Sequence, residues 1–596
     1  MSETLSGMKR THMCGELNET HNGAAVTVMG WVNKTRDLGP LVFITLRDRE
    51  GIVQLAFDDK TTSPEVFAKA KSAKNEYVLA ASGTVSLRAD KDINPDMATG
   101  KIEIKVDELR ILSEAETPPF PVGAAGVKED MRMKHRYLDM RRPEMQRNFL
   151  IRHKTNQAVR EFYSREGFLE IETPCLTKGT PEGAKEYIVP SRVFPGNFYV
   201  LPQSPQQFKQ MLMVGGFDRY FQLARCFRDE DNRADRQPEF TQLDVEMSFV
   251  DTEDILANSE QMLQYVFKKV IGLDVKLPLR RMTYAEAMDK YGSDKPDLRF
   301  GMEINNVSGI VKDTEFEAFK AARAEGYSVR GINIPGGAVF SRKQQDALQE
   351  FVKGYKAKGL FFISRADGEL KSSLSKFLSE DELNSVADVF AAKDGDLICL
   401  CADKDAVALT ALGALRGEAA RKLDIIDKDD FQFLWVTEMP LLEYDEENNK
   451  WNAVHHPFTA PMDEDVELFE TAPGRMRAKA YDVVLNGYEL GGGSVRIYQS
   501  DIQRLMFRAL GLSEDDINSR FGHILEAFKY GAPPHGGIAL GVDRVVMLMV
   551  GVDNIREVIA FPKTKDAYCP LMEAPNTISE RQLKELGIEI KAKPAQ

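Results

Sequence analysis

Two strand-like runs, residues 220–228 and 240–248, are joined by a short charged loop. This pattern predicts an antiparallel β-hairpin. Side chains two positions apart in a strand point to the same face, so Gln242, Asp244 and Glu246 share one side of the return strand. Apolar residues alternate with them and take the other side. The hairpin therefore predicts a sheet in which a row of polar groups lines one face.

Length and composition limit the class of protein. With 596 residues, 43% apolar and 29% charged, the chain exceeds one hydrophobic core and is typical of a globular protein with three or four domains. No run approaches the roughly 18 apolar residues of a membrane span, and the N-terminus has no apolar signal-peptide core. Its six cysteines include no CxxC pair, which indicates neither a zinc knuckle nor a disulfide framework. We predict a cytoplasmic protein with no membrane partner.

The net charge of −14 argues against a protein whose whole surface binds nucleic acid, and we expect no DNA partner. A local stretch, residues 128–154, is nevertheless rich in cations and poor in acids. A nucleic-acid track and a solvated helix face are both open interpretations of it. Its cations are Lys128, Arg132, Lys134, Arg136, Arg141, Arg142, Arg147, Arg152 and Lys154.

The chain shows several domains. Residues 24–112 form five strand-like runs separated by Gly, Asp and Asn turns, which predicts a small barrel of the OB-fold type. Such barrels commonly bind single-stranded nucleic acid through exposed aromatic and basic residues. Proline and glycine in residues 116–126 indicate a hinge, and a helical pattern begins at Met145. Residues from about 290 to 420 alternate strands and helices without concentrated chemistry, which predicts an inserted domain.

The segment FRDE, residues 227–230, ends the first strand of the hairpin. Arg228 and Glu230 point to one face, where Arg228 can bind an α-phosphate and Glu230 can accept a hydrogen bond from an adenine amino group. Phe240 opens the return strand as a stacking surface for the base, with Gln237 near it. A surface ion pair is the alternative interpretation.

The segment GVDR, residues 541–544, follows a glycine-rich strand. The glycine lets a helix approach closely, and helix N-termini favour anions, so Arg544 in the first turn predicts a second phosphate contact. A helix-capping aspartate followed by an exposed arginine is the alternative.

Asp482 and Glu489 lie between these motifs, followed by three glycines and Arg496. Carboxylates in a triphosphate site usually hold Mg²⁺, and the glycines leave space for a substrate. Arg496 with Lys209 makes a cation pair for a second anion, and Asp244 is a counter-charge for an α-ammonium group. A cation pair at one end and an acid at the other predict a pocket for aspartate.

Three segments in order, FLEIETP, FRDEDNRADRQPEFTQLDVE and GGIALGVDR, resemble the motifs of the bacterial-type aspartyl-tRNA synthetases, which are class II enzymes. The resemblance covers nearly the whole chain. It implies an α+β fold with a six-stranded antiparallel catalytic sheet flanked by helices, an N-terminal anticodon-binding OB-fold barrel, and a homodimer built around the first motif. The implied parts are the barrel (1–115), a hinge (116–144), the catalytic domain (145–289 and 423–564), an inserted α+β, GAD-like domain (290–422) and a C-terminal extension (565–596).

The resemblance also implies a role for each matching position. The ATP contacts, with Arg228 and Arg544 as catalytic residues, fall on Arg228, Asp229, Glu230, Gln237, Phe240, Glu489, Gly541, Val542, Asp543 and Arg544. The aspartate contacts fall on Glu182, Ser204, Gln206, Lys209, Arg228, Asp244, His455 and Arg496. Mg²⁺ falls on Asp482 and Glu489, and the tRNA anticodon on Arg36, Phe43 and Gln54. His455 as part of a buried packing turn and Phe43 as a core residue are the ordinary alternatives.

The implied reaction is ATP-dependent activation of L-aspartate to aspartyl-adenylate with release of pyrophosphate, then transfer to the 3′ end of tRNA(Asp). A non-discriminating enzyme that also charges tRNA(Asn) is the nearest alternative. Leu38 and Lys91 resemble the strict type, whereas HGG at 535–537 resembles some relaxed ones. An RNA-binding relative without catalysis is disfavoured because the ATP and aspartate positions are intact. A ligase for asparagine or lysine is disfavoured by the cation pair.

Overall fold

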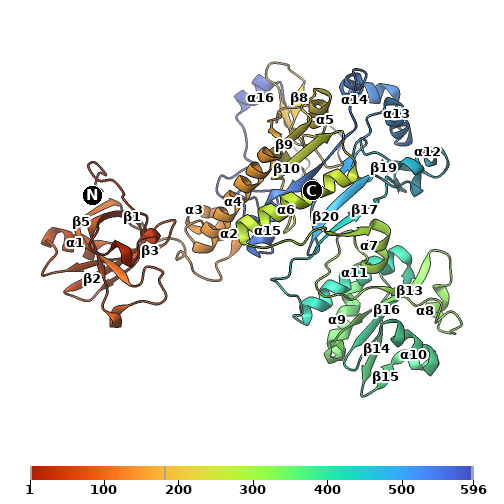
Figure 1. Ribbon diagram of the computed structural model, residues 1–596, viewed down its shortest axis with the longest axis horizontal. Helices are drawn as coiled ribbons and strands as arrows, with labels where there is room; N and C mark the ends of the chain where they lie inside the picture. Colours follow the sequence, from red (N-terminus) through yellow and green to blue (C-terminus); the bar gives the residue numbers. More distant parts are fainter. Residues whose placement is uncertain (1–2, 180–182, 592–596) are drawn as a thin grey trace. The chain divides into compact units, whose positions relative to one another are not determined.

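The computed structural model describes residues 3–179 and 183–591 (Figure 1). The chain divides into two compact units. The first consists of Met1–Arg152 and Arg556–Asn576, and the second of His153–Ile555 and Thr577–Gln596. This division is coarser than the domain boundaries expected from the sequence, which stay predictions. Within the described ranges, no helix has the length and apolar character needed to cross a membrane.

The first unit contains the predicted five-stranded barrel. The strands close in the order β1-β2-β3-β5-β4, with β3 and β5 parallel and the other pairs antiparallel. Alternation explains the closure, because Val42, Ile44 and Leu46 of β2 are fully buried while the residues between them face outward. The bounds are β1 (Ala25–Asp37), β2 (Leu41–Arg47), β3 (Ile52–Asp58), α1 (Pro64–Ser72), β4 (Val78–Leu87) and β5 (Ile102–Ser113).

The basic stretch after the barrel folds into α2 (Glu129–Lys134), α3 (Arg136–Asp139) and the start of α4 (Pro143–Arg165). Asp139 is fully buried and accepts from Arg132 at 2.8 Å, Arg136 at 2.6 Å and Arg142 at 3.1 Å. Arg136 also donates to the carbonyl oxygens of Ile559 and Ala560. Both interpretations of the stretch are therefore wrong for these three arginines. They converge on one buried carboxylate, a contact that charge spacing along the sequence does not reveal.

The second unit is built on an eight-stranded sheet, counted over the described residues. Its six central strands are antiparallel, as predicted, but a short parallel strand adds to each edge, so the expected total of six is wrong. Parallel neighbours need a crossover. Along the chain, helix α5 (Gln206–Val214) lies between β6 and β9, and α7 (Tyr284–Tyr291) with the inserted segment lies between β11 and β17. The strand order is β11 (Arg280–Thr283), β17 (Phe433–Thr437), β20 (Ala480–Leu485), β21 (Tyr488–Val495), β22 (His535–Gly541), β10 (Glu239–Ser248), β9 (Arg219–Phe227) and β6 (Leu169–Glu170).

Helices surround this sheet, with α6 against β22 and α15 and α5 against β10 (Figure 1). The buried Trp435 of β17 donates from its indole Nε1 to Glu260 of α6 at 3.0 Å, which ties that helix to the sheet. The helices are α5 (Gln206–Val214), α6 (Thr252–Ile271), α7 (Tyr284–Tyr291), α12 (Leu468–Thr471), α13 (Ser500–Ala509), α14 (Glu514–Phe528), α15 (Val542–Val550) and α16 (Glu580–Leu586). Two small hairpins complete this part, β7 (Ile188–Pro190) with β8 (Phe198–Val200) and β18 (Leu442–Asp445) with β19 (Lys450–Ala453).

The inserted segment has its own five-stranded sheet, in the order β12-β13-β16-β14-β15. One apolar cluster packs α9 and α11 on one face of it, and a second packs α8 and α10 on the other. The bounds are β12 (Asn305–Asn306), α8 (Glu317–Ala321), β13 (Tyr327–Ile334), α9 (Arg342–Lys353), β14 (Phe361–Ala366), β15 (Glu369–Ser372), α10 (Glu380–Val389), β16 (Leu397–Lys404) and α11 (Asp405–Lys422).

Candidate functional site

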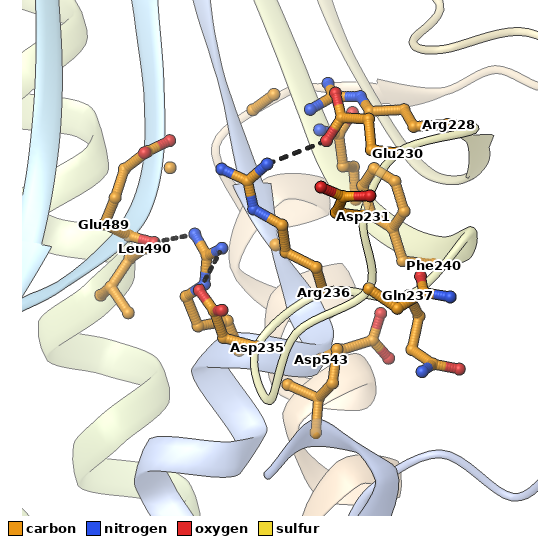
Figure 2. A pocket seen from close by; sticks show the side chains of 17 residues that line it. Arg228, Glu230, Asp231, Asp235, Arg236, Gln237, Phe240, Glu489, Leu490 and Asp543 are labelled. Carbon is orange, nitrogen blue, oxygen red and sulfur yellow. Dashed lines mark hydrogen bonds and ion pairs between the residues drawn. The ribbon is translucent and has the colours of Figure 1, made fainter. Parts of the chain in front are cut away.

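Two cavities adjoin on the polar face of the large sheet. The first, of about 180 Å³, lies between the β9–β10 hairpin with its loop, the start of β21 and the β22–α15 junction (Figure 2). The second, of about 670 Å³, extends from the same hairpin to α5, β20 and the segment after β19. Arg228, Glu230 and Glu489 line both cavities. The two hollows are therefore parts of one site.

The first cavity gathers most of the residues predicted to bind ATP. The side chain of Arg228 lies over the ring of Phe240, with its guanidinium carbon 5.2 Å from the ring centroid. Asp229 and Val542 are not among the residues that line either cavity. Asp229 lies just beyond the end of β9, where its backbone N–H donates to the carbonyl oxygen of Lys185 at 3.0 Å, and Val542 is buried in α15. The predicted residues that line the first cavity are Arg228, Glu230, Gln237, Phe240, Glu489, Gly541, Asp543 and Arg544.

Arg544 and Asp543 start the helix that closes the first cavity. The Arg544 guanidinium donates to the carbonyl oxygen of Glu489 and, at 3.1 Å, to the Asp235 carboxylate. Its Nε is buried and has no hydrogen-bond partner among the described residues. The Asp543 carboxylate accepts from the backbone N–H of Thr241 at 2.8 Å, so it holds β10 in place. Sequence patterns assigned no role to Asp235.

Lys209, Asp244 and Arg496 line the second cavity, and together with Glu246, which is not among the lining residues, they form a cluster of four buried charges. Lys209 donates to Asp244 at 2.9 Å and lies 3.6 Å from Glu246, while Arg496 donates to the two oxygens of Glu246 at 2.9 and 3.2 Å. All four side chains are at most 2% exposed. Burial raises the pKa of the Glu246 carboxyl, but Arg496 and Lys209 outweigh burial and hold that pKa below its ordinary value.

This geometry corrects one expectation. The cation pair and the acid were expected at opposite ends of the pocket, but Lys209 lies directly against Asp244. The reason is that side chains two positions apart in a strand share a face. Asp244 and Glu246 therefore lie on the face of β10 that is covered by α5, the helix that carries Lys209. The second oxygen of Asp244 is buried and has no hydrogen-bond partner among the described residues. Asp244 therefore still offers one acceptor to a ligand.

The neighbours of Arg496 complete its hydrogen bonds. Its Nη1 donates to Ser494 Oγ at 2.6 Å and lies 2.8 Å from His456 Nε2. Burial and the charge of Arg496 hold the pKa of His456 well below its ordinary value, so this imidazole is neutral. The sequence-based prediction gave no role to Glu246, Ser494 or His456. A signal existed for two of them, because Glu246 shares the face of Asp244 and His456 adjoins His455.

The other described residues that were predicted to bind the substrate aspartate also line the second cavity. His455, Ser204 and Gln206 lie on its wall together with Lys209 and Arg496. His455 Nε2 is buried without a hydrogen-bond partner in the described part of the chain, which favours a ligand contact over a packing turn. Glu182 falls outside the described residues.

Asp482 and Glu489 meet the chemistry expected for Mg²⁺. Both line the second cavity. Burial and the charges of Glu489 and Asp294 raise the pKa of Asp482 well above its ordinary value, so a cation would be favoured there. A Cβ at Gly492 would lie 2.0 Å from an oxygen of Asp482, so glycine leaves this carboxylate its space. No three His, Cys, Asp or Glu side chains in the described ranges could together hold a metal ion, but Mg²⁺ usually takes one or two carboxylates plus phosphates and water.

The barrel has a separate cavity of about 750 Å³ on its outer face. The residues predicted to read or discriminate tRNA all line it: Arg36, Leu38, Phe43, Gln54 and Lys91. Phe43 is half-buried between the fully buried Val42 and Ile44, so its alternative as a core residue is wrong. Gln54 donates from its amide nitrogen to Glu103 at 3.0 Å, which leaves its carbonyl oxygen to face a ligand.

Comparisons with known proteins agree with this layout. A family model described as tRNA synthetases class II (D, K and N) matches residues 128–565. A model described as OB-fold nucleic acid binding domain matches residues 26–112. The asparaginyl-tRNA synthetase of Pyrococcus horikoshii, solved with asparaginyl-adenylate, has a TM-score of 0.59 at 20% identity over 94% of this chain and 98% of that chain. The aspartyl-tRNA synthetase of Entamoeba histolytica has a TM-score of 0.57 at 20% identity, over 94% and 92%. These two show a shared fold.

Curated relatives are much closer in sequence. The aspartate–tRNA ligase of Ruminiclostridium cellulolyticum is 57% identical over 592 residues, which is 99% of this chain and 100% of the relative. The aspartate–tRNA(Asp/Asn) ligase of Caldanaerobacter subterraneus is 56% identical over 591 residues, with the same coverage.

The buried charge cluster makes a prediction about stability. Glu246→Gln should lower the free energy of unfolding by about 3–5 kcal/mol, because it leaves Arg496 and Lys209 buried with one acid fewer. Urea unfolding followed by fluorescence measures the change. Glu161→Gln is the control, since Glu161 is exposed and pairs with Lys269 at the surface, and it should shift the midpoint little. Equal midpoints for the two variants would contradict the cluster's structural role.

Proposed function

Because the chain belongs to the class II tRNA synthetases of the aspartate, lysine and asparagine group, we propose that it acts as an aspartate–tRNA ligase. The observation that carries the choice of amino acid is the second cavity, where Lys209 and Arg496 stand beside Asp244 with its unpaired oxygen. The cations suit a side-chain carboxylate and Asp244 suits an α-ammonium group. The close relatives named aspartate–tRNA ligase support the same choice.

ATP would bind in the first cavity. Its adenine ring stacks against Phe240, its amino group donates to Glu230, and its α-phosphate meets Arg228. Arg544 binds the terminal phosphates through Nη2 and through Nε, which has no hydrogen-bond partner in the described part of the chain; these two nitrogens form one edge of the guanidinium group. The two cavities adjoin at Arg228. The α-carboxylate of bound aspartate can therefore reach the α-phosphorus of ATP in line with the leaving pyrophosphate. The protein supplies position and charge, and no protein nucleophile is needed.

Selection of aspartate follows from the donors that remain. Arg496 has five N–H groups, of which two bond Glu246, one bonds Ser494 and one faces His456. One N–H is left for substrate, and Lys209 keeps donors beyond the one that bonds Asp244. The two oxygens of an aspartate side chain accept from both cations. Asparagine would turn its amide N–H₂ toward a donor and leave a buried charge unpaired.

Asp482 and Glu489 would hold Mg²⁺, as the donor chemistry of these carboxylates supports. When bound, the ion neutralises phosphate charge in the transition state. The glycines beside these carboxylates have no side chains, so they leave space in the cavity. A Cβ at Gly491 would lie 2.1 Å from the carbonyl oxygen of Ala539, so β21 and β22 can approach only with glycine there.

The tRNA is the acceptor in the second step, in which its terminal ribose hydroxyl attacks the adenylate and AMP leaves. We propose that its anticodon binds the outer cavity of the barrel, with a base stacked on Phe43 and others met by Arg36 and Gln54. The homodimer and the cytoplasmic location stay predictions, supported by the resemblance and by the sequence composition.

Charging of tRNA(Asn) is the second candidate activity, and two relatives carry the name aspartate–tRNA(Asp/Asn) ligase. Another relative of nearly equal identity is named for aspartate–tRNA alone. Leu38 and Lys91 line the barrel cavity, where the choice between anticodons would be made. We keep tRNA(Asp) as the proposed substrate.

Aspartate-dependent exchange of pyrophosphate into ATP tests the first step without tRNA. We expect exchange with aspartate and none with asparagine. Arg228→Ala should reduce the exchange rate by about 10²–10³-fold because the α-phosphate loses its fixed donor, while tRNA binding persists. Exchange with asparagine but not aspartate would overturn the choice of amino acid, and no exchange with either would favour a binding protein without catalysis.

The barrel role is tested by Phe43→Ala. Loss of one stacked base should weaken tRNA binding by about 1–3 kcal/mol, because Phe43 faces the outer cavity and its removal spares the core. Filter binding of tRNA measures the loss, and pyrophosphate exchange should stay at the wild-type rate. Unchanged tRNA affinity would refute the stacking role of Phe43.

Charging of purified tRNA(Asp) and tRNA(Asn) side by side decides between the two candidate activities. We expect efficient charging of tRNA(Asp) only, measured as kcat/KM for each tRNA. Comparable values for both would establish the non-discriminating alternative and leave the aspartate pocket unaffected.

A further inference from the structure

The loop between β9 and β10, residues 228–238, carries an acid into the first cavity. Figure 2 shows Asp235 of this loop at the cavity wall, and its carboxylate pairs with the guanidinium group of Arg544. The carboxylate oxygen accepts from Nη2 at 3.1 Å. Both side chains are mostly buried, at 19% and 28% exposed. The contact is therefore part of the site and not a surface ion pair.

The contact with Asp235 occupies only one of the two donors on one edge of the Arg544 guanidinium group. Nε and Nη2 are neighbouring donors that together make the fork for a two-oxygen acceptor. Asp235 takes Nη2, and Nε is buried without a hydrogen-bond partner among the described residues. Nη1 is engaged separately by the carbonyl oxygen of Glu489. A group with two suitably placed oxygens would fill the whole edge, and Asp235 would have to leave.

We propose that Asp235 is an internal competitor for the terminal phosphate of ATP, displaced from Arg544 when ATP binds and returning as pyrophosphate leaves. The inference rests on the proposed use of ATP. A phosphate satisfies both Nε and Nη2, so it outcompetes a carboxylate that satisfies one. The competition weakens the binding of ATP and of pyrophosphate alike, and it speeds release of the product.

Contacts made by the two neighbours of Asp235 hold this residue close to Arg544. The carbonyl oxygen of the adjacent Ala234 accepts from the backbone N–H of Ile555 at 2.9 Å, which anchors the chain next to the acid. Arg236, the other neighbour, donates to Glu230 at 2.9 Å (Figure 2). Rotation of the Asp235 side chain is then enough to free Arg544, without release of the loop.

Asp235→Asn tests the competition, because it keeps the shape and removes the charge. Titration calorimetry should show ATP binding about two- to fivefold tighter than in wild type, the upper part of the range measured for single solvent-accessible ion pairs. AMP lacks the terminal phosphates and should bind both proteins equally. In pyrophosphate exchange, the KM values for ATP and pyrophosphate should fall together while the KM for aspartate stays unchanged.

Asp231→Asn is the matched control. Asp231 lies in the same loop and lines the same cavity, and no contact joins it to Arg544 in the described structure. Its variant removes the same charge and should not tighten ATP binding to the same degree. Equal tightening in both variants would reduce the effect to the net charge of the loop and overturn the inference.

The remaining outcomes separate this inference from the proposed function. ATP binding that is unchanged or weaker in Asp235→Asn, with normal binding in wild type, overturns the competition alone, since Asp235 would then only position Arg544. A wild-type protein that binds neither ATP nor AMP overturns the proposed function together with the inference. Tightening for AMP as well as ATP also refutes it, because the effect would not depend on the terminal phosphates.

Discussion

Four buried charges, Lys209, Asp244, Glu246 and Arg496, hold the two halves of the large sheet in one arrangement. Charges cannot be buried singly without a cost of several kcal/mol each, and here each side chain lies against an opposite charge. They come from α5, from β10 and from the residue that follows β21, on both sides of the inserted segment. These contacts join residues that precede the insertion to one that follows it, and the ladder between β10 and β22 does the same.

The two cavities differ in how firmly their charges are held. In the second, Arg496 is fixed by Glu246, Ser494 and His456, so the donors that meet a substrate are set beforehand. In the first, Arg544 makes one contact with a loop carboxylate that a ligand can replace. A preorganised pocket suits selection of a small amino acid, and a replaceable contact suits a nucleotide that must bind and also leave as pyrophosphate.

Patterns along one segment of the sequence predict the features that depend on that segment alone. The barrel strands and the row Gln242, Asp244 and Glu246 follow from period-two alternation, and the motif residues around Arg228 and Arg544 do meet at one cavity. The contacts of the basic stretch, the parallel edge strands and the pair Asp235–Arg544 could not be predicted in this way. Each depends on which distant segment packs alongside, and charge or apolar spacing along one segment carries no information about that.

Selection of aspartate does not depend on the net charge of the second cavity. Acids outnumber cations among the residues that line it, since Glu230, Asp244, Asp294, Glu443, Asp482 and Glu489 lie there with Lys209, Arg228 and Arg496, so the field at the site is not that of a simple anion-binding pocket. In the proposed aspartate pocket, discrimination would lie in the order of donors and acceptors, because Asp244 and Glu246 are already engaged by Lys209 and Arg496 and these cations keep further donors for a substrate. A neutral His456 is part of this order, because a protonated ring would set a donor against Arg496. Because burial and the charge of Arg496 hold the pKa of His456 well below its ordinary value, the ring stays neutral at neutral pH and the hydrogen bonds of Arg496 do not change there.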